Sequence, residues 1–430
     1  MRSDLRWFSR NTFGMAAVSM LAAGLLAACG SSGTSGSGGS GSASSSAKGP
    51  LTIGASLSLT GDDSADGQAY DKGYNLWAKD VNAKGGILGR TVKLTILNDA
   101  SNPNQAVTNY QTLINSDHVD LTFGPFSSLI TTPAEAVAAR AGYAFIEGAG
   151  GAPTVFDTPA NEADHNLFDV SLPVADELVP LVNYIKSLPA SRRPKTAAYP
   201  MAQDPFADPP VQLAERDLQA LGVKTVYSKI FPEEVSDYKA PADQVAASGA
   251  QLVVLGSTDV PTVAAFMQAF EQQHYTPKLF AAAAGPDQGS AFISAVGQGN
   301  ATGMMVPDGW FPGYDNAASK KMVSEYVAEY GGTASGVNAD IAEAYSVGQV
   351  AEQAVTATGG TDNSKIISYL HSGVTLSSVQ GPVTFDSLGE NGASAAFIFQ
   401  WQKNGTFTQV LPAGAAGSTT ILAAKPSWSN

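Results

Sequence analysis

Residues 51–57 read Leu-Thr-Ile-Gly-Ala-Ser-Leu, an apolar run of the length typical of a buried β-strand. A polar turn rich in Gly and Asp follows at 61–67, and residues 68–82 then place aromatic and aliphatic side chains at the spacing of one buried helix face. Glycines at 85–86 end that helix, and 92–97 alternates as a second strand. This order predicts a βαβ unit, with parallel strands covered by helices.

The same unit recurs along the chain in two groups of similar size, separated by a pause at 166–173. Further strands are expected at 119–123, 143–146, 196–199, 225–230, 252–255 and 278–282, and further helices at 105–116, 133–141, 178–188, 211–221, 238–247, 260–273, 317–330, 339–358 and 366–370. An antiparallel ribbon is expected from 383–385, 396–402 and 406–410, followed by a loose C-terminal end. The pattern therefore predicts an α/β fold of two doubly wound, Rossmann-like lobes.

Ligands of doubly wound sheets bind beyond the carboxyl ends of the strands, so the loops that follow strands are the candidate site. Six loops qualify, at 58–67, 124–128, 147–151, 200–206, 256–261 and 283–288. We expect them to meet across a cleft between the lobes.

Composition excludes several classes of function. The 430 residues carry a net charge of −14, which argues against a nucleic-acid surface and against docking on anionic lipid through a basic patch. The single cysteine, Cys29, supplies neither an internal disulfide nor a multi-cysteine metal site.

The N-terminus has the features of an export signal. Three arginines precede an uncharged run at 13–28 that ends Leu-Ala-Ala before Cys29, which resembles the lipobox of bacterial lipoproteins. The resemblance implies a signal peptide at 1–28, cleavage before Cys29 and lipidation of its thiol; a weak membrane anchor with an incidental cysteine is the alternative. Residues 30–46 are almost all Gly and Ser, so 29–48 is expected to be a lipidated, flexible tether.

Signatures of catalysis are missing from the sequence. It contains no Gly-x-Ser-x-Gly elbow, no phosphate-binding Gly-x-x-x-x-Gly-Lys-Ser/Thr loop, and no pair of its four histidines at ligand spacing. Acidic clusters at 62–66 and 233–234 leave a paired-carboxylate hydrolase open, although acidic loops are usually solvated. We therefore expect no enzyme activity, no cofactor and no metal.

Five motifs, taken together and in order, resemble one family. They are Leu-Thr-Ile-Gly-Ala-Ser-Leu-Ser-Leu-Thr-Gly at 51–61, Val-Asn-Ala-Lys-Gly-Gly-Ile-Leu-Gly-Arg at 81–90, Asn-Asp-Ala with Asn-Pro-Asn-Gln-Ala-Val at 98–107, Gly-Pro and Ser-Ser at 124–128, and Gly-Pro-Val-Thr-Phe-Asp with Phe-Gln-Trp at 381–401. The family is that of the branched-chain amino-acid-binding proteins, type I periplasmic binding proteins of ABC importers. The resemblance spans about 50–410.

The resemblance implies two lobes joined by three crossing strands. The N-terminal lobe would comprise 50–169 plus 308–395, and the C-terminal lobe 170–307 plus 396–415. The implied function is an extracytoplasmic, lipid-anchored binding protein, held on the outer face of the bacterial membrane, that closes on a solute by hinge motion. Its partners would be the solute and the permease and ATPase subunits of an importer, and a monomer is expected.

The resemblance also implies site residues, one position at a time. Hydroxyls of Ser128 and its neighbour Ser127 would bind a ligand carboxylate, together with backbone N–H groups of Ala149, Gly150 and Gly151. The second lobe would add the remaining residues: an aromatic lid, Phe206, and the loop residues Thr258 and Asp259. Asp66, in the first loop, would face a polar ligand.

The sequence departs from the family where a carboxylate should pair with the amino group of the ligand. That position falls at Ala284, with Asp287 or Asp259 as substitutes. A buried ammonium without a partner is costly, so the ligand is expected to be a carboxylate without an amino group, an amide, or a small aromatic or other apolar compound.

Structural alternatives accompany each assignment. Ser127 and Ser128 would serve equally as helix N-caps, 148–151 as a tight turn, and Phe206 as a core residue. For the whole chain, a ligand-sensing receptor with the same fold is the alternative to import, because fold and cleft are shared.

Overall fold

The computed structural model describes residues 49–232, 238–414 and 418–428. The expected signal peptide at 1–28, Cys29 and the tether at 29–48 lie outside these residues. Within them, no helix is both long enough and apolar enough to cross a bilayer.

The first sheet is wholly parallel and forms the centre of one lobe. Its order is β2-β1-β3-β4-β5, from β1 (Leu51–Leu57), β2 (Val92–Asn98), β3 (Leu121–Phe123), β4 (Phe145–Glu147) and β5 (Leu167–Asp169). Strand β1 pairs in register with β2, from Leu51 opposite Val92 to Leu57 opposite Asn98. The strand β5 lies in the region where the sequence showed only a pause.

The second sheet centres the other lobe and is mixed. Its order is β14-β13-β10-β9-β8-β6-β7, from β6 (Thr196–Ala202), β7 (Lys224–Phe231), β8 (Leu252–Leu255), β9 (Leu279–Ala282), β10 (Met304–Asp308), β13 (Phe397–Trp401) and β14 (Phe407–Leu411). Strand β13 is antiparallel to both of its neighbours. The expectation that 383–385 joins this ribbon is wrong, because β12 (Gly381–Val383) pairs instead with β11 (Leu376–Ser378) in a separate two-stranded sheet.

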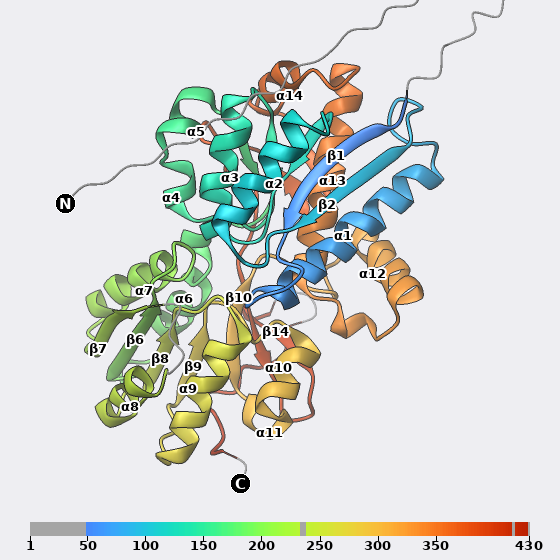
Figure 1. Cartoon of the computed structure of the whole chain (residues 1–430). Helices are drawn as coiled ribbons and strands as arrows, with labels where there is room; N and C mark the ends of the chain where they lie inside the picture. Colours follow the sequence, from blue (N-terminus) through green and yellow to red (C-terminus); the bar gives the residue numbers. More distant parts are fainter. Residues whose placement is uncertain (1–48, 233–237, 415–417, 429–430) are drawn as a thin grey trace, which may run out of the picture. The chain divides into compact units, whose positions relative to one another are not determined.

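Helices cover both sheets (Figure 1). The first lobe carries α1 (Ser64–Ala83), α2 (Pro103–Asn115), α3 (Ser128–Arg140), α4 (Pro153–Phe156), α5 (Pro159–Asp164), α12 (Ala317–Tyr330), the short η2 (Ala334–Gly336), α13 (Ala339–Thr358) and α14 (Asn363–Leu370). The second carries η1 (Val174–Asp176), α6 (Val179–Ser187), α7 (Asp208–Ala220), α8 (Lys239–Ser248), α9 (Val260–Gln272), α10 (Gly289–Val296) and α11 (Gln298–Ala301). Among the described residues the chain therefore passes between the two lobes three times: after β5, after β10 and before β13.

Helices α1 and α13 lie side by side in the first lobe, although they are far apart in sequence (Figure 1). Glycines permit this close approach. A Cβ at Gly348 would lie 2.1 Å from Cδ2 of Trp77, and one at Gly73 would lie 2.6 Å from the Ile341 carbonyl oxygen. Close packing brings the N-terminal ends of the two helices, which carry Asp66 and Asp340, to the same edge of the lobe.

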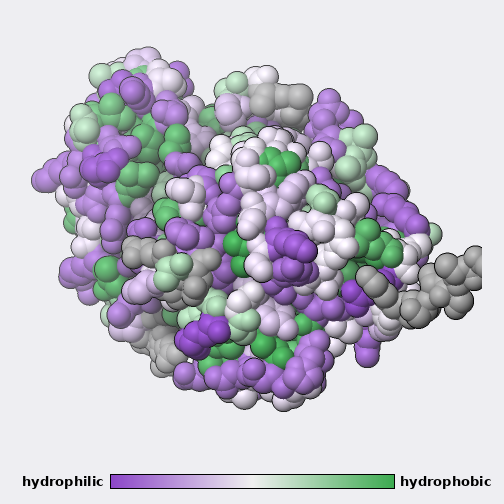
Figure 2. Space-filling view, turned by 90° about the horizontal axis from the view of Figure 1, so that it is seen from above, coloured by the Kyte–Doolittle hydropathy of each residue, from purple (hydrophilic) through white to green (hydrophobic). Residues whose placement is uncertain are grey.

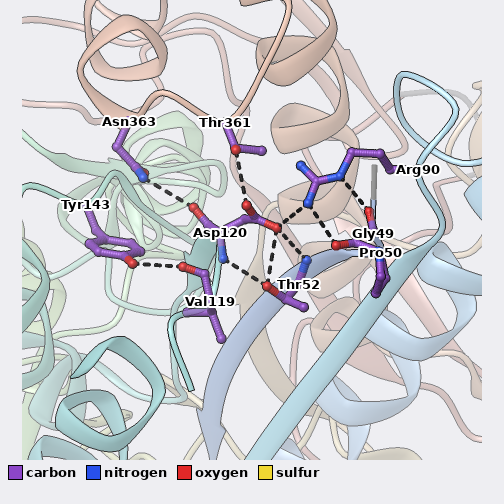
Figure 3. Close-up of polar contacts among 9 residues, drawn as sticks. All are labelled: Gly49, Pro50, Thr52, Arg90, Val119, Asp120, Tyr143, Thr361 and Asn363. Carbon is purple, nitrogen blue, oxygen red and sulfur yellow. Dashed lines mark hydrogen bonds and ion pairs between the residues drawn. The ribbon is translucent and has the colours of Figure 1, made fainter. Parts of the chain in front are cut away.

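A polar network fixes the start of the folded chain at the N-terminal end of β1 (Figure 3). The Arg90 side chain donates to the carbonyls of Gly49 and Pro50, at 2.9 and 2.8 Å, and pairs with the Asp120 carboxylate at 2.7 Å. Asp120 also accepts from the Thr52 backbone N–H at 2.9 Å. The chain thus enters the first sheet at Gly49 and Pro50, at the end opposite to the carboxyl ends of the strands.

The C-terminal residues 425–428 are packed rather than loose, which corrects the sequence expectation. Lys425 is buried, and its Nζ donates to the carbonyls of Asn300 and Thr302 at 2.6 and 2.9 Å. The Trp428 indole donates to the Tyr275 carbonyl at 2.6 Å.

The surface shows hydrophilic and hydrophobic residues interspersed on the face drawn in Figure 2. The large apolar side chains that are exposed among the described residues, such as Leu88 and Ile230, are isolated positions on different lobes. Scattered apolar residues of this kind are normal for a protein surface.

Candidate ligand-binding site

A cavity of about 80 Å³ lies between the lobes. Its wall comes from the first lobe at Asp66 and Ala149, from the second lobe at Phe206 and Ala284, and from the crossing segments around 169–177 and 307–309. One water needs roughly 10–15 Å³ of such space, so the cavity has room for a small organic molecule.

The predicted site residues separate into two groups. Seven line the cavity, namely Asp66, Ser127, Ala149, Gly151, Phe206, Thr258 and Ala284. Ser128, Gly150 and Asp259 are not part of the lining. Asp259 is instead the N-cap of α9, where its carboxylate accepts from the Thr262 backbone N–H at 2.7 Å. The binding roles of the seven remain predictions.

The expected cradle for a ligand carboxylate is already filled by the chain itself. The backbone N–H groups of Ala149 and Gly150 both donate to one carboxylate oxygen of Glu147, at 2.8 Å for Ala149. Burial raises the pKa of Glu147 to about 7, against the opposing effect of these two hydrogen bonds. The Ala149 and Gly150 donors are therefore engaged within the loop rather than available to a ligand, whereas the role of the Gly151 N–H stays a prediction.

The serine hydroxyl expected to bind that carboxylate is also directed elsewhere. Ser128 is fully buried, and its Oγ contacts the Ala149 carbonyl at 3.4 Å. Ser127 lines the cavity as the N-cap residue of α3, but its side chain makes no capping hydrogen bond. The capping alternative thus fails for Ser127, and one of the two expected hydroxyls remains on the cavity wall.

Gly151 makes room for an acidic group. A Cβ at this position would lie 2.7 Å from Oδ2 of Asp169, on the segment that leaves β5. Asp169 accepts from the Ser171 backbone N–H at 2.8 Å. A side chain at 151 would displace this carboxylate.

Carboxylates dominate the cavity wall, and we call them the acidic set. The set consists of Asp66, Asp169, Glu177, Asp287, Asp308, Asp340 and Glu343. The cavity lining, all of it in the described part of the chain, contains no Lys, Arg or His. Burial raises the pKa of every member, and for all but Asp287 the charges of neighbouring acids add to that effect. For Asp340 the pKa rises to about 8.

Three of these acids meet at the boundary between the lobes. Carboxylate oxygens of Asp66, Asp287 and Asp340 lie within 4.8 Å of one another. The side-chain amide of Gln288, on the second lobe, donates to Asp287 at 3.0 Å, to Asp340 at 2.8 Å and also to Asp66. Asn338 completes the group by donating to Gln288 Oε1 at 3.1 Å. Gln288 thus links the two lobes by direct hydrogen bonds.

The other four acids lie deeper along the crossing segments and α13. Glu343 accepts from the Tyr70 hydroxyl at 2.5 Å, and Asp308 accepts from the Trp310 backbone N–H at 3.2 Å. Glu177 is only 8% exposed, and its Oε2 has no hydrogen-bond partner among the described residues. Glu177 therefore lines the cavity with a buried carboxylate, one oxygen of which is enclosed and has nothing to accept from.

Sequence reasoning missed most of the acidic set. Asp169 and Asp308 are the last residues of β5 and β10, Glu177 follows η1, and Asp340 and Glu343 lie on α13. None of the five belongs to the six loops that the sequence analysis singled out. One signal was available: the first two turns of α13 place acids at 340 and 343 within a run that is otherwise almost wholly apolar. Acidic residues in a helix that is buried on most of its surface indicate a binding or other functional role for those side chains.

Comparison with known proteins agrees with this architecture. The periplasmic binding protein family matches residues 50–406. An amino acid binding protein of Pseudomonas aeruginosa is 24% identical over 379 residues, which cover 84% of this chain and 92% of the relative. All the residues that line the cavity lie within 50–406.

Solved structures share the fold. The branched-chain amino acid transporter substrate binding protein of Streptococcus pneumoniae, in complex with isoleucine, superposes with a TM-score of 0.71 at 18% identity, covering 83% of this chain and 97% of the other. A solute binding protein of an R. palustris ABC transporter, in complex with 4-hydroxybenzoate, gives 0.72 at 16% identity, covering 89% and 99%. The chain therefore belongs to the periplasmic binding protein family, whose members are extracytoplasmic solute-binding proteins of ABC transporters and not enzymes.

Proposed function

We propose that this chain captures a small solute in the cavity between its lobes and delivers it to an ABC importer of the branched-chain amino-acid type. The observation that carries the proposal is the composition of the cavity wall, which comes from both lobes and from the segments that connect them. A ligand there contacts both lobes at once, so its binding energy favours the closed arrangement over an open one.

Two further features support capture by closure. The Gln288 bridge is made of side-chain hydrogen bonds only, with Asp66 and Asp340 of the first lobe as acceptors. Such a contact breaks without disturbing either lobe's core. Relatives with the same fold hold ligands as different as isoleucine and 4-hydroxybenzoate, so the fold does not select the solute and the cavity residues must.

We propose in addition that the mature chain is tethered by lipid at Cys29. The Leu-Ala-Ala-Cys sequence and the Gly/Ser segment after it support this, since a flexible linker lets a folded module move above the membrane. Conversion of Cys29 to Ser should release the chain from the membrane fraction and remove the lipid mass from its N-terminal peptide. Unchanged membrane retention of that variant would contradict the anchor.

Delivery is tested by reconstitution of the full chain with the permease and ATPase subunits of a branched-chain amino-acid importer from the same organism. We expect ATP hydrolysis to rise only when the binding protein and the solute that co-purifies with it are both present. Ala284→Trp places an indole in the cavity and should abolish the stimulation, whereas Ala328→Trp, at an exposed position of α12, should preserve it. No stimulation by the wild-type chain would favour the ligand-sensing alternative.

A further inference from the structure

The charge of the cavity identifies the class of solute, an inference that rests on the proposed function of the cleft. Seven carboxylates line a space of about 80 Å³, and the described lining offers no cationic side chain to balance them. Buried carboxylates without counter-charges are costly in a protein interior. In the ligand-free protein such acids are neutralised by protons, and a cationic ligand that displaces those protons would complete the set.

A metal ion is a poor match for this charge. The only group of acids close enough to ligate one ion within the described residues is Asp66, Asp287 and Asp340. The Gln288 amide nitrogen already donates to all three of these side chains, so an N–H donor occupies the position from which an ion would be held. The three acids thus accept hydrogen bonds from a nitrogen donor, as they would from an ammonium group, rather than leaving an open position for a metal ion.

The unsatisfied acceptor lies elsewhere in the cavity. Glu177 is more than nine-tenths buried, and its Oε2 lacks any partner among the described residues. Asp169 and Asp308 line the same cavity, and the charges of Asp308, Asp287 and Asp169 add to the effect of burial in raising the pKa of Glu177. A hydrogen-bond donor that carries positive charge would satisfy Glu177 and offset its neighbours at once.

An anionic group has no equivalent place. The N–H groups of Ala149 and Gly150 are taken by Glu147, and the Ser128 hydroxyl lies outside the lining. A ligand carboxylate would meet the acidic set on a wall whose side-chain hydroxyls come from Ser127, Ser171 and Thr258 and that offers no cationic side chain, so the lining disfavours the zwitterionic mode of amino-acid capture. The proposal therefore differs from our sequence-based expectation of a carboxylate ligand.

Apolar and aromatic walls complete the description. Phe126, Phe206, Leu172 and Val174 line the same cavity. Aromatic faces attract cations, and aliphatic walls favour a short hydrocarbon stem. We propose that the solute is a small organic cation, an amine on a short aliphatic stem without a carboxylate, whose ammonium group is bound at Glu177.

Three molecules with the same branched alkyl group test the proposal, because they differ only in charge. They are 3-methylbutylamine, leucine and 4-methylpentanoate, which are cation, zwitterion and anion; 1,4-diaminobutane and calcium chloride complete the panel. We expect both amines to raise the melting temperature of the full chain, and leucine, 4-methylpentanoate and calcium to have little effect.

Glu177→Gln tests the position of the ammonium group while nearly preserving side-chain shape. We expect amine affinity, measured by calorimetry, to fall at least tenfold in this variant, and the same for Asp308→Asn. Asp117→Asn removes one exposed carboxylate in the turn after α2 and should bind amines like the wild type. Glu177→Gln removes an unpartnered buried carboxylate, so the melting temperature of the ligand-free variant should not fall. If it does fall, the amine affinity of Asp308→Asn tests the position of the ammonium group instead.

Several results would overturn the inference. Stabilisation by leucine or 4-methylpentanoate but not by amines would do so while leaving solute capture intact. Stabilisation by calcium alone would assign the acids to a metal. Equal amine affinity in the wild type, Glu177→Gln and Asp308→Asn would show that the ammonium group does not bind in this part of the cavity.

Discussion

The acidic set should make the ligand-free protein less stable as pH rises, and Asp340 gives the clearest test. Its carboxylate lies near that of Asp66 in the same lobe and that of Asp287 across the lobe boundary, with Glu343 on the same helix and the Gln288 and Asn338 amides as donors. Burial, then the charge of Asp287, raises its pKa from 3.8 to about 8.

The sign and size of the effect follow from proton linkage. Because the folded pKa is above the unfolded value, the native state holds a proton that the unfolded chain has released between about pH 4 and pH 8. Stability from this group is present below the unfolded pKa and is lost as pH rises through that window. Each pH unit costs about 1.4 kcal/mol per shifted carboxyl, or about 2.7 kcal/mol from pH 5 to pH 7.

Asp340→Asn removes the proton while keeping an oxygen that accepts from Gln288. We expect the free energy of unfolding of this variant to decline less steeply with pH, by about 1.4 kcal/mol per pH unit. Urea titrations at pH 5, 6 and 7, followed by fluorescence of the buried Trp77 and Trp310, measure the slope. Asp117→Asn is the exposed control. Parallel pH profiles for the wild type and Asp340→Asn would refute the reasoning.

The remaining predictions concern binding, closure and packing. Amine affinity should rise with pH between about 6 and 8, by up to tenfold per pH unit for each proton released, and calorimetry in buffers of different ionisation enthalpy should detect that release. Gln288→Ala removes the bridge between the lobes, so small-angle scattering should give the ligand-free variant a larger radius of gyration than the wild type. Gly348→Ala forces Trp77 to move and should lose about 1–3 kcal/mol in urea unfolding, whereas Gly360→Ala, with open space around its Cβ, should change by less than about 0.5 kcal/mol.

The fold was largely predictable because its information is local. The strand at 51–57, the helix after it and the strand at 92–98 are each specified by their own periodicity, and their order then determines a parallel sheet. The prediction failed for short elements. Strand β5 has three residues, too few for an alternation to be seen, and β12 forms a short hairpin with β11 across residues 379–380 instead of joining the later ribbon. The packing of Lys425 and Trp428 likewise depends on distant carbonyl groups.

The site was predictable in place but not in chemistry. Loops that follow parallel strands were expected to converge, and Ser127, Ala149, Phe206 and Ala284 do line one cavity. The hydrogen-bond partners of these loop residues could not be deduced from the sequence. The Glu147 carboxylate, for example, accepts from the N–H of Ala149 in the loop that follows it, and no spacing rule indicates that hydrogen bond.

Local hydrogen bonding therefore decides what such a cleft can recognise. In the site that the family resemblance implies, backbone donors after β4 face an anion, and Ala284 stands where a carboxylate would balance an ammonium. Here Glu147 turns the same donors inward, and Gly151 leaves space for Asp169, so the strand ends present acid where they would have presented N–H groups. The crossing segments add Glu177 and Asp308 to that surface. The fold and the cavity are kept, but the sign of the charge they accept is reversed, and this reversal follows from a few side chains rather than from any change of architecture.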